Sequence, residues 1–527
     1  MKQWIIGPIF IIIIFSFPLS QGQEKSQHSG EVYDSAMELF YKGKYQEALE
    51  GFSKLIQSFP TSKLVSYSHY MIGQSFLNME RYGEAIQQFE FYLKTYPDGD
   101  RAKEAEKGLQ ISKEKLKPKI EITETVVETK PPVEEPKKVE VRAPVEEPKV
   151  QMVPEVKRVK RRICAQVFYI DAKNFDEVEK RVKELKNAGV DTVILRVFQN
   201  RGDRMYKFVK PRYEEGVYFK TEHAPVVADI LGKVTEIVHR NGLDIFAWMT
   251  TRYALYGIEG HPEWRCKSYN FETTKMEIGR GFNLFHHNVL KRLEGLFRDL
   301  GRYPIDGILF QDDLILRHNE DFSTEANKAF LKEFGFSPHP DIFYIEPYRT
   351  ESGKYYVKAY TDRFWTWANW KNRWLMNVAK QLMDVARESN PNLKFGINLY
   401  YETVLNHSNA VAWFSQTLSE ALDKDFDYFA IMAYHRQTMK ELDMEEQKAM
   451  DLMVEVAQKA VQSIGDPSKV IMKIQVLDWK DYELIPPKEV ETLLTGVLEQ
   501  GEVSLAFVPY IHQFPLHQLK GKWITSK

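Results

Sequence analysis

Beyond residue 162, short runs of β-branched and aromatic residues alternate with longer amphipathic stretches. This alternation is typical of successive βα units. The short runs predict eight strands, at residues 164–170, 191–198, 243–249, 305–311, 393–399, 426–433, 470–476 and 503–508. The longer stretches predict helices between them, including 175–188, 226–241, 289–300, 358–388 and 445–463. Residues 161–527 therefore predict an α/β fold, a (β/α)8 TIM-like barrel with insertions. An open doubly wound sheet is the alternative, but no glycine-rich phosphate loop follows the first strand.

Residues 30–117 show helical periodicity with small residues at fixed positions. Two halves repeat at an offset of 37 residues, with Ala36, Tyr45, Ala48, Phe52 and Pro60 aligning with Gly73, Tyr82, Ala85, Phe89 and Pro97. Each half predicts a helix pair closed by proline, and the pattern resembles tetratricopeptide repeats. We expect a small all-α N-terminal domain. Its concave face suits docking of a protein or envelope partner, although a spacer that merely folds is equally compatible with the pattern.

The N-terminus carries a targeting pattern. A basic start is followed by the apolar run 4–17 and by small residues before Glu24. This run of 14 residues is shorter than the ~20 that cross a bilayer. Residues 1–22 therefore predict a signal peptide, with an uncleaved anchor as the alternative. We expect secretion across the inner membrane and a periplasmic or envelope-associated location.

A segment of biased composition separates the two predicted folded regions. Residues 118–160 are rich in Pro, Val, Glu and Lys, and Pro-Val-Glu-Glu-Pro-Lys occurs at 132–137 and again at 144–149. Prolines remove backbone donors and favour extended geometry, so the segment is predicted to be a semi-rigid linker.

Charge and cysteine content narrow the possible functions. The chain has 72 Lys and Arg against 74 Asp and Glu, a formal net charge of −2, which argues against a nucleic-acid partner. Its two cysteines exclude a disulfide framework, leaving Cys164 and Cys266 either paired or as two buried thiols. His286 and His287 are adjacent and lack metal-ligand spacing, and no His-Cys zinc pattern occurs, so neither a metal nor a cofactor is predicted.

Acids and aromatic residues dominate the positions just past the predicted strands. In a barrel of this kind these positions form the reaction face. The polar and aromatic residues there are Asp171, Arg196, Gln199, Trp248, Asp312, Asp313, Tyr400, Tyr401, Glu402, Tyr434, Gln475, Asp478, Trp479 and Tyr510. Rings with polar tips suit the faces of sugars, so the set indicates a saccharide site.

Adjacent carboxylates at Asp312 and Asp313 end the fourth predicted strand. Side chains alternate along a strand, so the two should point to different surroundings and acquire different pKa values, as glycosidic cleavage requires of its acid and its base or nucleophile. The alternative is that one of them only caps a turn. Glu402, beyond the fifth strand, is the candidate second carboxylate, or a solvated loop residue.

A second polar cluster follows the aspartate pair. It includes His318, Glu320 and Asp321, which could reach the same mouth. Ser323 is a plausible N-cap for a helix over 324–334, and Asp321 could simply support that helix start. We predict catalytic roles for Asp312, Asp313 and Glu402. The predicted substrate-binding residues are Trp248, Arg196, Glu320, Asp321, Tyr400, Tyr434, Gln475 and Trp479.

These segments, in this order, resemble the C-terminal glycoside-hydrolase domain of the PgaB family, which processes poly-β-1,6-N-acetylglucosamine. The resemblance rests on the motifs at 246–249, 306–313, 320–323, 412–414, 430–433 and 475–479. It implies endo-cleavage of partly de-N-acetylated polymer, with the catalytic aspartate at Asp312 or Asp313. The chain differs in having Gln311 where His is common and Tyr434 where Met is usual.

Family members usually also carry a metal-dependent deacetylase domain. Residues 30–117 have neither the Asp-Asp nor the His-x-x-x-His ligands of that domain, so deacetylation is not predicted. The alternative to a glycoside hydrolase is a non-catalytic protein that binds polysaccharide and guides its export, with the repeats docking a partner.

Overall fold

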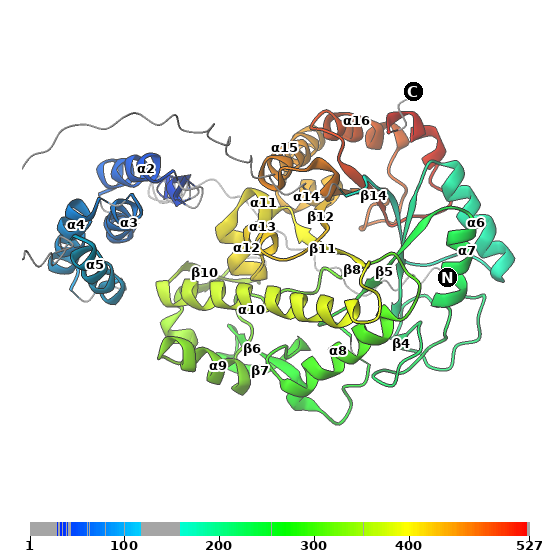
Figure 1. The fold of residues 1–527 in the computed structure, drawn as a ribbon, viewed down its shortest axis with the longest axis horizontal. Helices are drawn as coiled ribbons and strands as arrows, with labels where there is room; N and C mark the ends of the chain where they lie inside the picture. The colour runs from blue at the N-terminus through cyan, green and yellow to red at the C-terminus, as the bar shows by residue number, and fades with distance from the viewer. Residues whose placement is uncertain are drawn as a thin grey trace, which may run out of the picture. The chain divides into compact units, whose positions relative to one another are not determined.

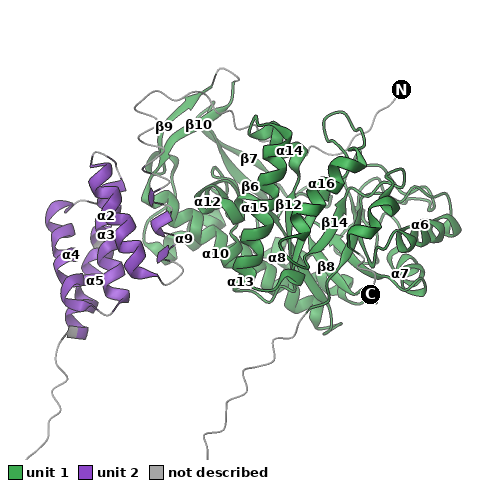
Figure 2. Ribbon diagram, turned by 90° about the horizontal axis from the view of Figure 1, so that it is seen from above, with its two compact units in different colours: residues 1–17, 158–527 green, residues 18–157 purple. Residues whose placement is uncertain are grey.

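The structure, a computed structural model, describes residues 44–116 and 159–523 apart from 61, 63, 80, 98, 100, 255, 351 and 352, together with 29, 32, 33, 35–37, 39 and 40. These residues form two compact units, a helical one within 18–157 and a barrel within 158–527 (Figure 2). The predicted signal peptide, 1–22, lies outside the described residues, and so does the predicted linker, 118–160, except for its last two positions.

The helical unit contains the predicted repeats. Its helices are α2 (Tyr45–Ser58), α3 (Leu64–Asn78), α4 (Tyr82–Thr95) and α5 (Ala102–Leu116). Equivalent positions of the two repeats are fully buried, Ala48 and Phe52 in α2 and Ala85 and Phe89 in α4. A Cβ on Gly73 would meet the Phe89 ring at 2.7 Å, which explains the small residue where α3 and α4 cross. The tetratricopeptide-like architecture is confirmed.

The barrel is closed by eight parallel strands, each hydrogen-bonded to its neighbours in chain order and the last paired with the first (Figure 1). The strands are β1 (Ile163–Val167), β2 (Thr192–Arg196), β5 (Asp244–Met249), β8 (Gly307–Phe310), β11 (Lys394–Tyr400), β12 (Tyr428–Ala433), β13 (Val470–Gln475) and β14 (Ser504–Val508). Each corresponds to one predicted run. Because both faces of a barrel strand are buried, these segments read as nearly continuous apolar sequence.

Amphipathic helices surround the strands. The long ones are α6 (Phe175–Asn187), α7 (Leu231–Arg240), α8 (His287–Gly301), α10 (Asp362–Arg387), α15 (Glu446–Ile464) and α16 (Pro487–Leu498). Further helices in the loops after the strands are α9 (Thr324–Phe334), α11 (Glu402–Leu405), α12 (His407–Phe414), α13 (Leu418–Leu422) and α14 (His435–Glu441). Trp367 and Trp370 of α10 are buried. None of the helices among the described residues combines the length and apolar character that a membrane span requires.

Three antiparallel hairpins lengthen the loops after β2, β5 and β8, and the sequence pattern does not predict them. They are β3 (Phe198–Gln199) with β4 (Gly216–Val217), β6 (Arg265–Asn270) with β7 (Lys275–Phe282), and β9 (Tyr344–Arg349) with β10 (Tyr355–Tyr360). The helix expected from residue 358 is wrong at its start. Residues up to Tyr360 pair with β9, and α10 begins only after Thr361, whose hydroxyl caps it by accepting from the Phe364 N–H. Cys164 on β1 and Cys266 on β6 are separate buried thiols.

Candidate active site

The carboxylate of Asp313 is enclosed by the loop that follows β5. It accepts hydrogen bonds from the backbone N–H groups of Thr251 (3.0 Å), Arg252 (2.8 Å) and Tyr253 (2.8 Å). The hydroxyls of Thr250 (2.5 Å) and Thr251 (2.8 Å) donate as well. Asp313 is only 1% exposed. These donors occupy the lone pairs of both oxygens, so the side chain fixes the loop and has no acceptor capacity left for a sugar.

The neighbouring Asp312 lies in different surroundings, as alternation along a strand predicts. Its side chain is half-buried and interacts electrostatically with Lys473, Tyr400 and Tyr434. Burial raises the pKa of Asp312 above its ordinary value; the Lys473 charge lowers it and the Asp313 charge raises it. A carboxyl whose pKa is raised can hold a proton closer to neutral pH and donate it. Of the two aspartates, Asp312 is thus the one suited to proton transfer.

A buried lysine approaches Asp312 from inside the barrel. Lys473 of β13 is 2% exposed, and its Nζ donates to Asn398 Oδ1 on β11 at 2.8 Å. Asn398 in turn donates to the carbonyl of Phe310, the last residue of β8, at 2.8 Å. Burial lowers the pKa of Lys473 to about 8 and the Asp312 charge opposes that fall. The lysine is therefore largely charged at neutral pH and favours the ionised form of Asp312.

Aromatic side chains from several strand ends gather at the same mouth. Trp248, on β5, packs against Phe168, which follows β1, with 4.6 Å between ring centres. Phe168 also stacks with Trp479, after β13, at 6.5 Å and 17°. Trp479 meets Tyr434, after β12, edge to face at 5.8 Å. The structure thus brings together three of the predicted stacking residues and adds Phe168, which the sequence interpretation missed.

Tyr400 connects Asp312 to α12. Its hydroxyl donates to the backbone carbonyl of Asp312 at 3.4 Å, and its ring stacks on Phe414 at 4.0 Å and 5°. The guanidinium of Arg317 lies 5.6 Å from the centre of the Phe414 ring. Its charge acts on Asp312, Tyr400 and Glu402. No carboxylate among the described residues forms an ion pair with Arg317, so this cation at the mouth is open to a ligand.

Glu402 begins α11 and is held mainly in its neutral form. One carboxyl oxygen, Oε2, is buried and accepts no hydrogen bond within the described part of the chain. Burial, reinforced by the charge of Glu441 at the end of α14, raises the pKa of Glu402 to about 8. Glu441 itself is buried, which raises its pKa to about 7. The charges of both Asp312 and Glu402 help to raise the pKa of Tyr400, for which burial is the main cause.

The structure does not bring Glu320 and Asp321 to the surface of the mouth. Both are buried in the loop after β8, where Glu320 forms an ion pair with Arg252 at 3.2 Å. Asp321 accepts from the N–H groups of Lys267 and Ser323, each at 2.8 Å. These bonds join the loop to β6 and to the start of α9. Ser323 is indeed the N-cap of α9, accepting from the Ala326 N–H.

The two remaining predicted residues, Arg196 and Gln475, are held by contacts within the fold. Arg196, the last residue of β2, forms an ion pair with Asp203 and lies over the Phe198 ring, which packs edge to face on Trp248 at 5.7 Å. Gln475, the last residue of β13, is fully buried and donates to the Leu477 carbonyl at 2.8 Å. Both therefore support the mouth from within the fold.

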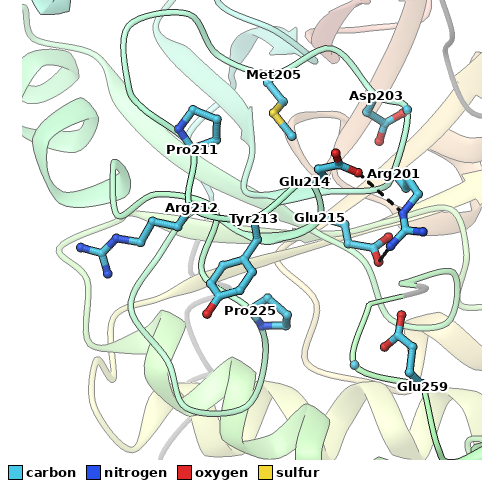
Figure 3. Close-up of a pocket in the computed structure, with 12 residues that line it drawn as sticks. Arg201, Asp203, Met205, Pro211, Arg212, Tyr213, Glu214, Glu215, Pro225 and Glu259 are labelled. Atoms are coloured by element: carbon cyan, nitrogen blue, oxygen red, sulfur yellow. Dashed lines mark hydrogen bonds and ion pairs between the residues drawn. The ribbon is translucent and has the colours of Figure 1, made fainter.

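A cleft of about 1010 Å³ lies between the loop after β2 and the loop after β5 (Figure 3). Four acids line it against two arginines, Arg201 and Arg212. The acids are Asp203, Glu214, Glu215 and Glu259. Arg201 pairs with Glu214 and Glu215, and Asp203 pairs with Arg196 from outside the lining. The four acids therefore exceed the three arginines by one charge. Asp312 is not part of this cleft. Within the described ranges no group of three or more His, Cys, Asp or Glu residues could hold a metal ion.

The comparisons with known proteins agree with this architecture. Residues 169–508 match the family described as hypothetical glycosyl hydrolase family 13, and residues 31–62 match a tetratricopeptide repeat family. Among solved structures, the glycoside hydrolase domain of PgaB (BpsB) from Bordetella bronchiseptica superposes with a TM-score of 0.56 at 19% identity. That likeness covers 70% of this chain and 100% of the other, and it supports the fold.

Curated relatives are similar over part of their length. The poly-beta-1,6-N-acetyl-D-glucosamine N-deacetylases of Escherichia coli strains K12 and O157:H7 are each 26% identical over 358 residues. The similarity covers 65% of this chain and 48% of each relative, so the chain spans about half the length of the curated relatives it matches.

Proposed function

Since the chain belongs to the hypothetical glycosyl hydrolase family 13, we propose that it is a glycoside hydrolase and that Asp312 is its proton-transferring carboxyl. The observation that carries this proposal is the contrast between two adjacent aspartates. Asp313 has its oxygens occupied by backbone and hydroxyl donors, whereas Asp312 is half-buried at a mouth lined with aromatic rings and has a raised pKa. Cleavage of a glycosidic bond requires such an acid to protonate the leaving oxygen.

The other groups at the mouth fit roles in the same reaction. Trp479, Tyr434 and Phe168 offer ring faces on which sugar C–H groups can stack. Arg317 offers donors for sugar hydroxyls or an amide carbonyl. Lys473 keeps the pKa of Asp312 from rising further, so the carboxyl can give up its proton and take one back during turnover.

We propose partly de-N-acetylated poly-β-1,6-N-acetylglucosamine as the substrate, cleaved internally. The name of the curated relatives, poly-beta-1,6-N-acetyl-D-glucosamine N-deacetylase, supports this substrate class. A polymer bearing free amines is cationic, and the acid-rich cleft between the loops after β2 and β5 would attract it. The endo mode follows from the resemblance to the PgaB family.

The test is cleavage by the full chain. Incubation with the partly de-N-acetylated polymer should lower its mean length early, before short products accumulate, because internal cuts halve chains whereas end cuts trim them. Asp312→Asn should reduce the rate by about 10²- to 10⁴-fold, the usual contribution of general acid–base catalysis, without changing the thermal midpoint. Failure of the intact protein to cleave any amino-sugar polymer would remove the proposal.

One observation favours a second candidate, a non-catalytic protein that binds and guides polysaccharide. Glu402, the predicted second carboxylate, is mostly protonated at neutral pH because its pKa is about 8, and in that form it serves neither as a base nor as a nucleophile. In this case the polymer should bind without forming products, and Asp312→Asn should leave its affinity unchanged.

The cellular setting is part of the proposal. We propose that residues 1–22 direct secretion across the inner membrane, placing the barrel in the periplasm or envelope, and that the repeats of α2–α5 dock a protein of the export machinery. The match to a tetratricopeptide family supports a docking role. N-terminal sequencing of the protein recovered from the cell envelope tests the targeting, since removal of the apolar run 4–17 is expected.

A further inference from the structure

The β9–β10 hairpin carries a regular set of side-chain pairs on one face. Cross-strand register joins Tyr344 with Tyr360 and Tyr348 with Tyr356, and Lys358 forms an ion pair with Glu346 between them at 2.7 Å. The Tyr348 and Tyr356 rings stack at 6.1 Å and 30°. One face of the hairpin thus alternates aromatic and charged pairs from its base toward its tip.

This face is turned toward α12 at the barrel mouth. At its base, the Tyr360 hydroxyl is hydrogen-bonded to His318 Nδ1 at 2.8 Å. Trp413 of α12 packs on the His318 ring at 4.3 Å and meets Tyr356 edge to face at 6.2 Å. The hairpin projects from the body of the barrel unit (Figure 2). Because Trp413 contacts Tyr356, the face of the hairpin that carries Tyr356 is the one that borders the mouth.

Helix α12 connects this aromatic face with the proposed reaction centre. Trp413 is followed in α12 by Phe414, whose ring stacks on Tyr400, and Tyr400 donates to the Asp312 carbonyl. Phe414 itself is buried, so α12 joins Tyr400 to the hairpin by packing, and Trp413 is the ring that it presents to the hairpin. None of these hairpin residues lies in the acid-rich cleft, so the aromatic face of the hairpin is a separate feature.

Its outer end is unusually exposed for aromatic surface. Tyr348 is 50% exposed, while Tyr356 and Trp413 are half-buried. Leaving such a ring in water forgoes the stabilisation that its burial would provide. Rings alternating with a charged pair match a polysaccharide, which presents C–H faces for stacking and hydroxyls for hydrogen bonding.

We propose that Tyr348, Tyr356 and Trp413 form a distal binding path for the amino-sugar polymer, holding units of the chain beyond those at Asp312. This inference rests on the proposed function, since it takes the polymer to be the ligand of the mouth. The path would favour long substrates, because a short oligosaccharide that fills the mouth does not reach the hairpin.

Binding to a cleavage-deficient protein tests the path directly. In the full chain carrying Asp312→Asn, Tyr348→Ala and Tyr356→Ala should each weaken binding of long, partly de-N-acetylated polymer by about two- to tenfold, the value of one aromatic contact. Affinity for a trisaccharide should not change. Tyr348→Phe, which keeps the ring, should restore long-chain binding. Phe91→Ala is the matched control, because Phe91 is a similarly exposed aromatic residue, 45%, in α4 of the helical repeats and outside the barrel unit.

Three results would overturn the path: equal loss of affinity for the trisaccharide, loss with Phe91→Ala alone, or no loss in either hairpin variant with circular dichroism unchanged. If the hairpin instead serves a protein partner, polymer affinity will be unaffected by both substitutions. Failure of the proposed binding path can be distinguished from failure of the proposed hydrolase activity. Tyrosine-dependent binding by a wild-type protein that cleaves nothing would retain the path and remove the hydrolase, and cleavage without tyrosine dependence would do the opposite.

Discussion

Replacing Asp313 by asparagine should destabilise the barrel, although this residue is adjacent to the proposed proton donor. Its carboxylate accepts from three consecutive backbone N–H groups and two hydroxyls of residues 250–253. Asparagine keeps one oxygen and replaces the other with an NH2 group, which would face donors. No rotation of the side chain can satisfy every group in the loop.

The magnitude follows from the number and kind of these bonds. Hydrogen bonds to a charged acceptor contribute about 1.5–3 kcal/mol, against about 0.5–1.5 kcal/mol for neutral ones. If the amide oxygen takes the place of Oδ2, the bonds from Thr250, Arg252 and Tyr253 survive but weaken by about 1 kcal/mol each. The Thr251 hydroxyl can turn to accept from the new NH2. The neutral asparagine also avoids the cost of burying a charge, which offsets part of this loss. The net decrease in the unfolding free energy is about 2–4 kcal/mol.

Urea unfolding followed by tryptophan fluorescence measures this cost. Nine of the ten tryptophans lie between Trp248 and Trp523, within the barrel unit, so the signal reports on the barrel and not on the helical repeats. Asp312→Asn is the matched control, with the same chemical change one residue away. It should leave the unfolding free energy within about 1 kcal/mol of wild type. The Asp312 carboxyl is half-buried and its pKa is already raised, so the fold gains no stability from its charge.

The reasoning fails if Asp313→Asn unfolds at the wild-type urea concentration, since the enclosed carboxylate would then contribute little. It also fails if Asp313→Asn is stable but inactive while Asp312→Asn still cleaves polymer. That result would exchange the roles of the two aspartates.

Two further predictions concern the groups around the reaction centre. Glu402→Gln should raise the unfolding free energy at pH 9 by up to a few kcal/mol relative to wild type and change it little at pH 4. The pKa of Glu402 is raised from 4.5 to about 8 in the fold. The stability that its neutral carboxyl contributes is therefore fully present below pH 4.5 and is lost as pH rises through 8. A loss of stability at pH 9 would contradict this. Lys473→Met should shift the alkaline limb of the kcat/KM profile upward by roughly half a unit to one unit, because removal of the ammonium raises the pKa of Asp312. Lys480→Met, at an exposed position, should not shift the profile, and an unchanged or lowered limb in Lys473→Met would show that Asp312 does not set it.

The barrel strands, four to seven residues long, could be predicted from sequence because closure buries both of their faces, which leaves short and nearly continuous apolar runs. The hairpins could not. A two-sided antiparallel ribbon such as β9–β10 has no continuous apolar run, and its tyrosines at 355–360 merge with the amphipathic pattern of α10. The helix expected from residue 358 was therefore placed too early, and the last three residues of β10, 358–360, were predicted as part of a helix.

The different roles of Asp312 and Asp313 depend on contacts between segments that are distant in the sequence. The donors that occupy Asp313 come from a loop about 60 residues earlier, and Arg317 and Phe414 meet at the mouth from different loops. One feature of the sequence nevertheless indicated residues near the reaction centre. Asn398 and Lys473 each interrupt an otherwise apolar barrel strand, and a buried polar group is costly unless it has a partner. Lys473 and Asn398 are hydrogen-bonded to each other, Asn398 also bonds to β8, and the Lys473 charge acts on Asp312. A polar residue inside an apolar barrel strand should therefore be treated as a candidate for positioning the reaction centre, as should the residues that follow the strand ends.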